Sequence, residues 1–150
     1  MRVAEIPAEA THELRRRVLR RGRREAEVRF AGDDAAGTLH LAVLDDDGRP
    51  LAVATASPQA CERRAGRTAW KVRGMAVKPE RQGEGLGGRL LEEIEARATG
   101  AGIEVLWADG RDSALGFYRR RGWVVEGESY LTPATGLAHH TIIRDVLLPP

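Results

Sequence analysis

The chain has 150 residues, of which 42% are hydrophobic and 31% are charged, and its formal net charge is +2. This length suits a single domain over residues 1–150 with one core, and the composition is that of an ordinary soluble globule. No run approaches 18 apolar residues, so no transmembrane helix and no membrane partner are expected.

Targeting and cysteine signals are sparse. The N-terminus, MRVAEIPAEATHEL, lacks the apolar stretch of a signal peptide. Cys61 is the only cysteine, which excludes an internal disulfide and indicates a reducing compartment. A cytoplasmic protein is therefore expected, with Cys61 as a passive loop residue. The four histidines lack metal-ligand spacing, so no metal is predicted.

The first predicted element is a short amphipathic helix in AEATHELRRRVLR, residues 8–20. Leu14, Val18 and Leu19 form its apolar face, and Gly22 ends it. Basic residues cluster over residues 15–24, which leaves two interpretations, a nucleic-acid arm or a solvated helix face. EAEVRFAGDD follows at once and no aromatic residue is interleaved, so the solvated face is favoured and no nucleic-acid partner is expected.

Next come three predicted strands. TLHLAVL and LAVATAS flank an Asp-Gly turn, which predicts a hairpin. AWKVRGMAV predicts another strand, ended by Pro79.

A second helix begins after Gly83. Its apolar stripe consists of Leu86, Leu90, Leu91, Ile94 and Ala98, and Gly100 is a stop signal. The rest of the chain predicts a buried strand in IEVLWA, a short helix in DSALGFYRRRG, and strands in WVVEGESYL and HHTIIRDVLL. With a further strand expected before the first helix, the order β-α-β-β-β-α-β-α-β-β predicts a mixed α/β (α+β) sheet with helices packed on it.

Two interpretations compete for the glycine-rich stretch QGEGLGG. Gly83-x-Gly85-x-x-Gly88 matches the dinucleotide fingerprint, and Asp109 follows at the end of a predicted strand, where a ribose-binding acid belongs. Against this, KPERQ separates the glycines from the preceding strand, and a hairpin stands where parallel repeats are needed. A Walker P-loop is excluded, because no Lys-Ser/Thr follows the glycines.

The other interpretation is a resemblance. Gln82-x-x-Gly85-x-Gly87 resembles motif A of the GNAT superfamily of N-acetyltransferases, and GMAVKP looks like the strand that precedes this motif. The segment from Ala114 to Trp123, ALGFYRRRGW, is similar to the family's second signature, Ala-x-x-Phe-Tyr-x-x-x-Gly-Phe, with Trp for the last Phe. The resemblance implies the GNAT fold, a central mixed sheet flanked by helices. It also implies acetyl-CoA as the cosubstrate and direct attack by a primary amine.

The physics of the loop agrees with this resemblance. Consecutive N–H groups at a helix N-terminus suit the pyrophosphate of coenzyme A, and Glu84 is expected to face solvent. The strand end is expected, by resemblance, to carry a bulge whose N–H groups face the acetyl carbonyl. Arg111 stands where many family members have asparagine. The coenzyme-binding residues implied are Met75, Ala76, Val77, Gln82, Gly83, Glu84, Gly85, Leu86, Gly87, Gly88, Arg111, Ala114 and Phe117.

The candidate catalytic residues are Tyr118 and His139. By resemblance, Tyr118 is the general acid, because a phenol is protonated at pH 7 and donates to a thiolate. Its alternative is a core tyrosine beside Phe117. His139 is favoured as a base or water relay over His140, since strand alternation sends the two to opposite faces. Glu126 and Glu128 are unranked alternatives.

The acceptor is less defined. The position eleven residues before Gln82, where some family members carry a glutamate base, is Lys71. Alternation places Lys71 and Arg73 on one face, which predicts a cationic acceptor pocket for a carboxylate or phosphate. The alternative is a solvated edge or a salt bridge to a neighbouring strand.

We expect a small metabolite or amino acid derivative as acceptor, with a protein amine second. Lys71 in the base position leaves open another function, a coenzyme-A-binding sensor or interaction module with little turnover. A homodimer is also left open.

Overall fold

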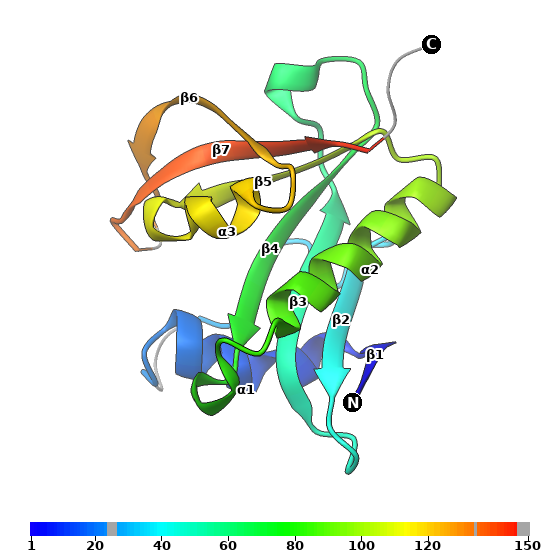
Figure 1. Cartoon of the computed structure of the whole chain (residues 1–150), viewed down its shortest axis with the longest axis vertical. Coiled ribbons are helices and arrows are strands. Elements are labelled where there is room, and N and C mark those ends of the chain that lie inside the picture. Colours follow the sequence, from blue (N-terminus) through cyan, green and yellow to red (C-terminus); the bar gives the residue numbers. More distant parts are fainter. Residues whose placement is uncertain (24–26, 134, 147–150) are drawn as a thin grey trace. The chain divides into compact units, whose positions relative to one another are not determined.

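A computed structural model describes residues 1–23, 27–133 and 135–146 of the chain (Figure 1). In these ranges seven strands form one sheet in the order β1-β2-β3-β4-β5-β7-β6. The chain divides into two compact units, unit 1 (Met1–Pro58 and Val72–Arg97) and unit 2 (Gln59–Lys71 and Ala98–Pro150). The expectation of one domain over residues 1–150 stays a prediction.

Unit 1 contains the predicted hairpin. Strand β1 (Arg2–Glu5) pairs antiparallel with β2 (Leu39–Leu44), and β2 pairs antiparallel with β3 (Pro50–Pro58). The Asp-Gly turn joins β2 to β3, with Gly48 in the left-handed region at φ 79°. Strand β4 (Ala69–Val77) enters unit 1 at Val72, and its bounds are those that the sequence predicts.

The N-terminal helical segment covers one face of the unit 1 strands. It runs as η1 (Ala8–Thr11), α1 (His12–Leu14) and η2 (Arg15–Leu19). Its predicted apolar residues pack on a buried cluster of Ala42, Leu44, Val53 and Ala76. The predicted solvated basic face is wrong at its first residue, because the Arg15 side chain is 0% exposed. The end of the basic cluster, Arg24, lies outside the described residues.

Helix α2 (Leu86–Gly100) follows β4 through the short turn η4 (Pro79–Arg81). Its predicted apolar stripe is confirmed, since all five members are buried. Figure 1 shows α2 crossing in front of β2 and β3. On that side of the strands, Leu41, Val43, Ala52 and Ala54 are fully buried. Unit 1 is thus a sheet with both faces covered.

Unit 2 holds the remaining strands. β5 (Val105–Arg111) pairs parallel with Ala69–Lys71 of β4 and antiparallel with β7 (Ala138–Asp145), which pairs antiparallel with β6 (Val124–Leu131). The loop before β4 contains η3 (Glu62–Arg64). The parallel pair of β4 and β5 beside antiparallel pairs makes the sheet mixed, which confirms the predicted fold class. The predicted end of the last strand, Leu147 and Leu148, lies outside the described residues.

The short turn η5 (Asp112–Ala114) and helix α3 (Leu115–Arg119) lie on one face of the unit 2 strands. A Cβ built at Gly122, just after α3, would lie 2.7 Å from Nη1 of Arg144, which pairs with Leu106 in the sheet. Leu106, Ala108 and Gly110 therefore face α3, whereas Trp107, Asp109 and Arg111 point to the other face.

No described helix has both the length and the apolar character needed to cross a membrane.

Candidate functional site

The glycine-rich loop of unit 1 is fastened to the end of β4. The backbone N–H of Lys78 donates to the Leu51 carbonyl at 2.8 Å. The side-chain Nε2 of Gln82 donates to the Val77 carbonyl at 3.3 Å. The motif glutamine thus ties the loop back to the strand that precedes it.

The loop presents bare backbone to open space. Gly83 and Gly85 have φ values of 85° and 79°, which favour glycine, and a Cβ built at either meets nothing within 4 Å. The first helical bond of α2 runs from the Arg89 N–H to the Gly85 carbonyl at 3.1 Å. The N–H groups of residues 86–88 precede that bond and so have no acceptor within the helix. Such a helix N-terminus fits a pyrophosphate.

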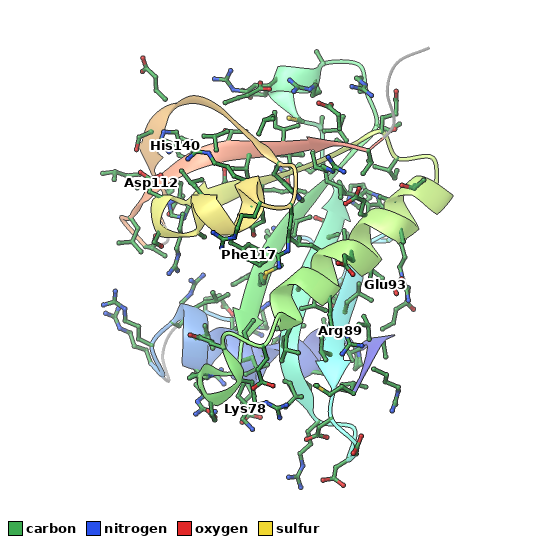
Figure 2. All side chains as sticks on the ribbon, viewed as in Figure 1. Lys78, Arg89, Glu93, Asp112, Phe117 and His140 are labelled. Carbon is green, nitrogen blue, oxygen red and sulfur yellow. The ribbon has the colours of Figure 1, made fainter. Side chains whose placement is uncertain are left out.

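Glu84 does not spoil this cradle. It is exposed, as expected, and its carboxylate accepts two hydrogen bonds from Arg81, at 2.8 and 3.0 Å. The bond from Arg81 holds the pKa of the Glu84 carboxyl below its usual value. The negative charge is therefore compensated within the loop, and Lys78 and Arg89 add cations on either side of it in the sequence (Figure 2).

The end of β4 is irregular. Gly74 lies within the strand at φ 64°, and a left-handed glycine inside a strand is typical of a bulge. Beyond it, Ala76 is buried while Met75 and Val77 are half-buried. A Cβ at Gly74 would lie 3.2 Å from Nε of Arg15 and 3.2 Å from Phe30, so a side chain here would push on both neighbours and would be strained at this positive φ. Donation from residues 75–77 to an acetyl carbonyl stays a prediction.

Behind Gly74 lies a buried ion pair that sequence reasoning missed. Nη1 of Arg15 donates to Asp33 Oδ2 at 2.6 Å, and Nη2 donates to Oδ1 at 3.1 Å. The guanidinium also donates to the Val28 carbonyl at 2.8 Å and to Oγ1 of Thr55 at 2.9 Å. Burial alone would raise the pKa of Asp33, but Arg15 and the Phe30 N–H outweigh it and hold the pKa below its usual value. This pair anchors the segment before β2 against β3, to which Thr55 belongs.

Lys71 lies in unit 2 and makes the salt bridge that was its alternative interpretation. Its Nζ is 2.8 Å from Oδ2 of Asp109 on the neighbouring strand, and it lies 4.8 Å from the ring centre of Trp107. Burial alone would raise the pKa of Asp109, but hydrogen bonds from Lys71 and Tyr130 outweigh it and lower the pKa. The charge of Lys71 is thus already compensated.

His139 shares this face of unit 2. The sheet register places it between Arg111 of β5 and Tyr130 of β6. It is buried, its ring stacks on Tyr130 with centroids 6.4 Å apart, and its Nδ1 lies 2.7 Å from the Leu137 carbonyl. Because a carbonyl only accepts, Nδ1 is the protonated nitrogen of the neutral ring, and Nε2 keeps a lone pair for a proton.

Tyr130 was not foreseen in this cluster. Its hydroxyl donates to Oδ1 of Asp109 at 2.5 Å, and burial together with the Asp109 carboxylate raises the pKa of Tyr130 to about 12. The sequence held a signal for its partner Asp109. On a predicted strand Asp109 follows Trp107 by two residues, so alternation places both on one face.

Tyr118 lies on the opposite side, on α3. Its ring packs edge-on against Phe117 at 5.0 Å and against Trp123 at 5.2 Å. Burial raises the pKa of Tyr118 to about 12, so the phenol stays protonated at neutral pH. Among the described residues, three arginine Nε atoms are buried without a hydrogen-bond partner. The Tyr118 hydroxyl is not among these atoms. Tyr118 and His139 are not brought to one face.

The other predicted residues of unit 2 lie at the end of β5 and in the segment from η5 to α3. Arg111 ends β5, Ala114 lies in η5, and Phe117 lies on α3 with the Arg121 guanidinium 4.0 Å from its ring centre. His140 lies on the α3 side, with Nδ1 2.6 Å from Oδ1 of Asp112 (Figure 2).

The two alternative glutamates differ. The bond from Arg64 to Glu126, 2.6 Å at its shortest, lowers the pKa of that carboxyl and makes it a weak base, whereas Glu128 is exposed. Within the described ranges, no group of three or more His, Cys, Asp or Glu side chains is arranged to hold a metal ion.

Comparison with known proteins bears on the family and the fold. Residues 7–123 match the Acetyltransferase (GNAT) family. The chain is 29% identical over 147 residues to a protein of Bacillus subtilis (strain 168) named uncharacterized N-acetyltransferase YitI. The matched region covers 98% of this chain and 97% of that protein.

Solved structures share the fold. The structure of an aminoglycoside 6'-N-acetyltransferase complexed with coenzyme A matches with a TM-score of 0.79 at 13% identity, over 100% of this chain and 99% of that one. An acyl-CoA N-acyltransferase from Pseudomonas aeruginosa matches with a TM-score of 0.75 at 20% identity, over 95% of this chain and 98% of that one. At these identities the two structures show the fold alone.

Proposed function

The chain belongs to the GNAT family of acetyltransferases, and we propose that it transfers the acetyl group of acetyl-CoA to the primary amine of a small acceptor. It is therefore an acyltransferase. The observation that carries the choice of coenzyme is the loop before α2, where left-handed glycines and free helix N–H groups border open space. The coenzyme A bound by one structural neighbour supports the same choice.

Acetyl-CoA would supply a thioester, and residues of unit 1 would bind it. The N–H groups of residues 82–88 bind the pyrophosphate, with the positive end of the α2 dipole behind them. Backbone donors at Met75, Ala76 and Val77 hold the acetyl carbonyl and stabilise the negative charge that forms on its oxygen. Gly74 allows the strand to turn these groups outward.

Residues of unit 2 would move the protons. Nε2 of His139 accepts a proton from the attacking amine, whose nitrogen forms the new bond to the acetyl carbon. As the carbon–sulfur bond breaks, the Tyr118 hydroxyl donates its proton to the leaving thiolate. The amine nitrogen and the sulfur are bonded to the same acetyl carbon, whereas Tyr118 and His139 lie on opposite faces of the unit 2 strands, so His139 would act on the amine through a relay of water molecules.

The remaining assignments rest on the sequence. We propose a single catalytic domain in the cytoplasm, because one buried cysteine suits a reducing compartment. A small-molecule amine is favoured as acceptor, and the name of the aminoglycoside acetyltransferase indicates such an acceptor for that neighbour. A homodimer stays a prediction.

The first test is calorimetric titration with acetyl-CoA, with NADH in a parallel cell. Binding of acetyl-CoA alone, with a Kd of about 1–100 µM, is expected for the anion cradle. Binding of NADH alone would mean that the glycines form the dinucleotide fingerprint.

A second assay follows the release of free thiol from acetyl-CoA across a panel of amines. Turnover of at least one amine above the rate without acceptor supports transfer. Tight acetyl-CoA binding without turnover on any amine would favour a coenzyme-A sensor.

A further inference from the structure

Arg73 in unit 1 carries a charge that no salt bridge compensates within the described residues. Its one hydrogen bond there runs from Nη2 to the backbone carbonyl of Ala31, a neutral acceptor. Its Nε is buried and has no partner in that part of the chain. Among the described residues, the guanidinium is therefore positioned without a counter-ion.

The carboxylate that acts on Arg73 is already engaged elsewhere. Asp33 is the acid whose charge favours the protonated form of Arg73. Both oxygens of Asp33 accept from Arg15, at 2.6 and 3.1 Å, and Oδ2 also accepts from the Phe30 N–H at 2.8 Å. Within the described ranges, this one carboxylate thus acts on two guanidiniums and pairs with only one of them, Arg15, which leaves the charge of Arg73 in excess there.

Burial makes this excess costly. Arg73 is half-buried, and the loss of water around it lowers the pKa of its guanidinium, as does the charge of Arg15. A cation removed from water without a partner is destabilised until an anion binds beside it. The position therefore favours an anionic ligand over water.

The surroundings are rigid and open at one edge. Arg15 fixes the segment from Val28 to Asp33, and its guanidinium lies 4.0 Å from the ring centre of Phe30. A Cβ at Gly32 would lie 3.1 Å from Nη2 of Arg73, so the guanidinium lies directly against backbone. Ala31 and Gly32 are exposed, and a ligand can approach from their side.

We propose that Arg73 binds the carboxylate of the acceptor, so that the enzyme acetylates amines that carry a carboxylate, such as amino acids. This inference rests on the proposed acetyltransferase function. The planar fork of arginine matches a carboxylate. Arg73 precedes Met75 by two residues, at most ~7 Å along an extended strand, so the anion lies close to the proposed acetyl group. The coenzyme phosphates have their own cradle beyond Val77.

The test uses matched pairs of amines, each an amino acid beside its carboxamide, with acetyl-CoA in excess. We expect kcat/KM to favour the acid by about 10- to 100-fold, the range for a hydrogen bond to a charged group. Arg73→Gln should remove this preference by raising the KM for the acid, and it should leave the KM for acetyl-CoA unchanged. Arg73→Lys should restore it in part, because the charge remains and the fork is lost.

Arg17→Gln is the matched control. Arg17 is an exposed arginine of the same unit, and its charge is already paired with Glu80 at 2.5 Å. Its loss should change neither the acid preference nor either KM by more than about twofold.

Several outcomes would overturn the inference. Equal turnover of acid and carboxamide by the wild type would do so without any variant, and so would an acid preference that survives in Arg73→Gln. A raised KM for acetyl-CoA in that variant would assign Arg73 to the coenzyme phosphates instead. A protein that binds acetyl-CoA but acetylates neither member of any pair would remove the transfer proposal, and this inference with it.

Discussion

Two cations two residues apart on β4 differ in their ion pairing among the described residues. Lys71, in unit 2, has Asp109 of the neighbouring strand at 2.8 Å. Arg73, in unit 1, lies near Asp33, but Arg15 has already bound that carboxylate. Alternation along the strand makes the two cations equivalent. What distinguishes them is whether the carboxylate that a distant segment of the chain brings is still available, as Asp109 is for Lys71, or is already paired, as Asp33 is with Arg15.

The two ion pairs also differ in burial. The side chains of Arg15 and Asp33 are 0% and 6% exposed, whereas those of Lys71 and Asp109 are 18% and 33% exposed. A broken buried pair leaves an isolated charge away from water, whereas a broken half-exposed pair leaves a charge that water can reach. Removal of one partner should therefore lower the free energy of unfolding far more for the pair in unit 1 than for the pair in unit 2.

Arg15→Met is expected to have the largest effect. It leaves the Asp33 carboxylate buried without its cation, and loss of one partner of a buried pair typically costs about 3–5 kcal/mol. Urea unfolding at pH 7 measures the loss, with Arg17→Met as the control at an exposed pair, where about 1 kcal/mol or less is expected. The double variant Arg15→Met, Asp33→Leu should recover part of the stability. If it is as unstable as Arg15→Met, the isolated charge is not the cause.

Tyr118→Phe separates chemistry in unit 2 from binding in unit 1. We expect kcat to fall by about 10- to 100-fold, because the thiolate loses its acid. The Kd for acetyl-CoA should not change, since the loop that binds it lies in unit 1. Rapid-quench turnover and calorimetry measure the two quantities. Because burial raises the pKa of Tyr118 to about 12, the phenol should not limit activity in the usual alkaline range. An unchanged kcat would leave Tyr118 as a core residue.

Gly85→Ala should weaken coenzyme binding in unit 1. Gly85 is left-handed at φ 79°, so alanine is strained by about 1 kcal/mol, and its methyl group enters the open space proposed for the pyrophosphate. We expect the Kd for acetyl-CoA to rise about tenfold. Gly66→Ala is the matched control, because Gly66 has the same φ and equally open surroundings in unit 2. Equal weakening of coenzyme binding by both variants would point to general destabilisation.

The sequence predicted what depends on neighbours along the chain. The bounds of β4, the hairpin around Gly48 and the buried stripe of α2 follow from periods of two and 3.6 residues and from turn residues. The motif loop was predicted too, because its glycines and its helix lie within one short segment.

The charge network could not be predicted in the same way. Arg15 reaches Asp33 across a loop, and Thr55 from the hairpin completes its shell. A basic run with an amphipathic face normally points its charges to water, so burial of its first arginine has no local signal. The partner of Lys71 was accessible in principle, since Asp109 shares the face of Trp107, the residue paired with Lys71.

The smallest expected effect is the pH dependence of the stability that the Lys71–Asp109 pair contributes. It tells whether Asp109 stabilises unit 2 by its charge or by its packing. The pKa of Asp109 is lower in the folded chain than its usual 3.8, so folding favours the ionised form. Its stabilisation is complete above about pH 5, where the carboxyl is ionised in the unfolded chain too, and is lost as the pH falls toward the folded pKa. The difference in unfolding free energy between the wild type and Asp109→Asn should be about 1 kcal/mol or less at pH 7 and should shrink below about pH 4.

Lys71→Met removes the other partner of the same ion pair. It leaves Asp109 with Tyr130 as its hydrogen-bond donor, so the pKa of the carboxyl should rise toward its usual value and the loss of stability on acidification should be smaller than in the wild type. Chemical denaturation from about pH 7 to pH 3 measures both variants against the wild type. If the difference for Asp109→Asn stays constant over that range, Asp109 contributes by shape and neutral hydrogen bonding. Lys71 would then keep a charge that is free to bind an acceptor, as the sequence first suggested for both cations of β4.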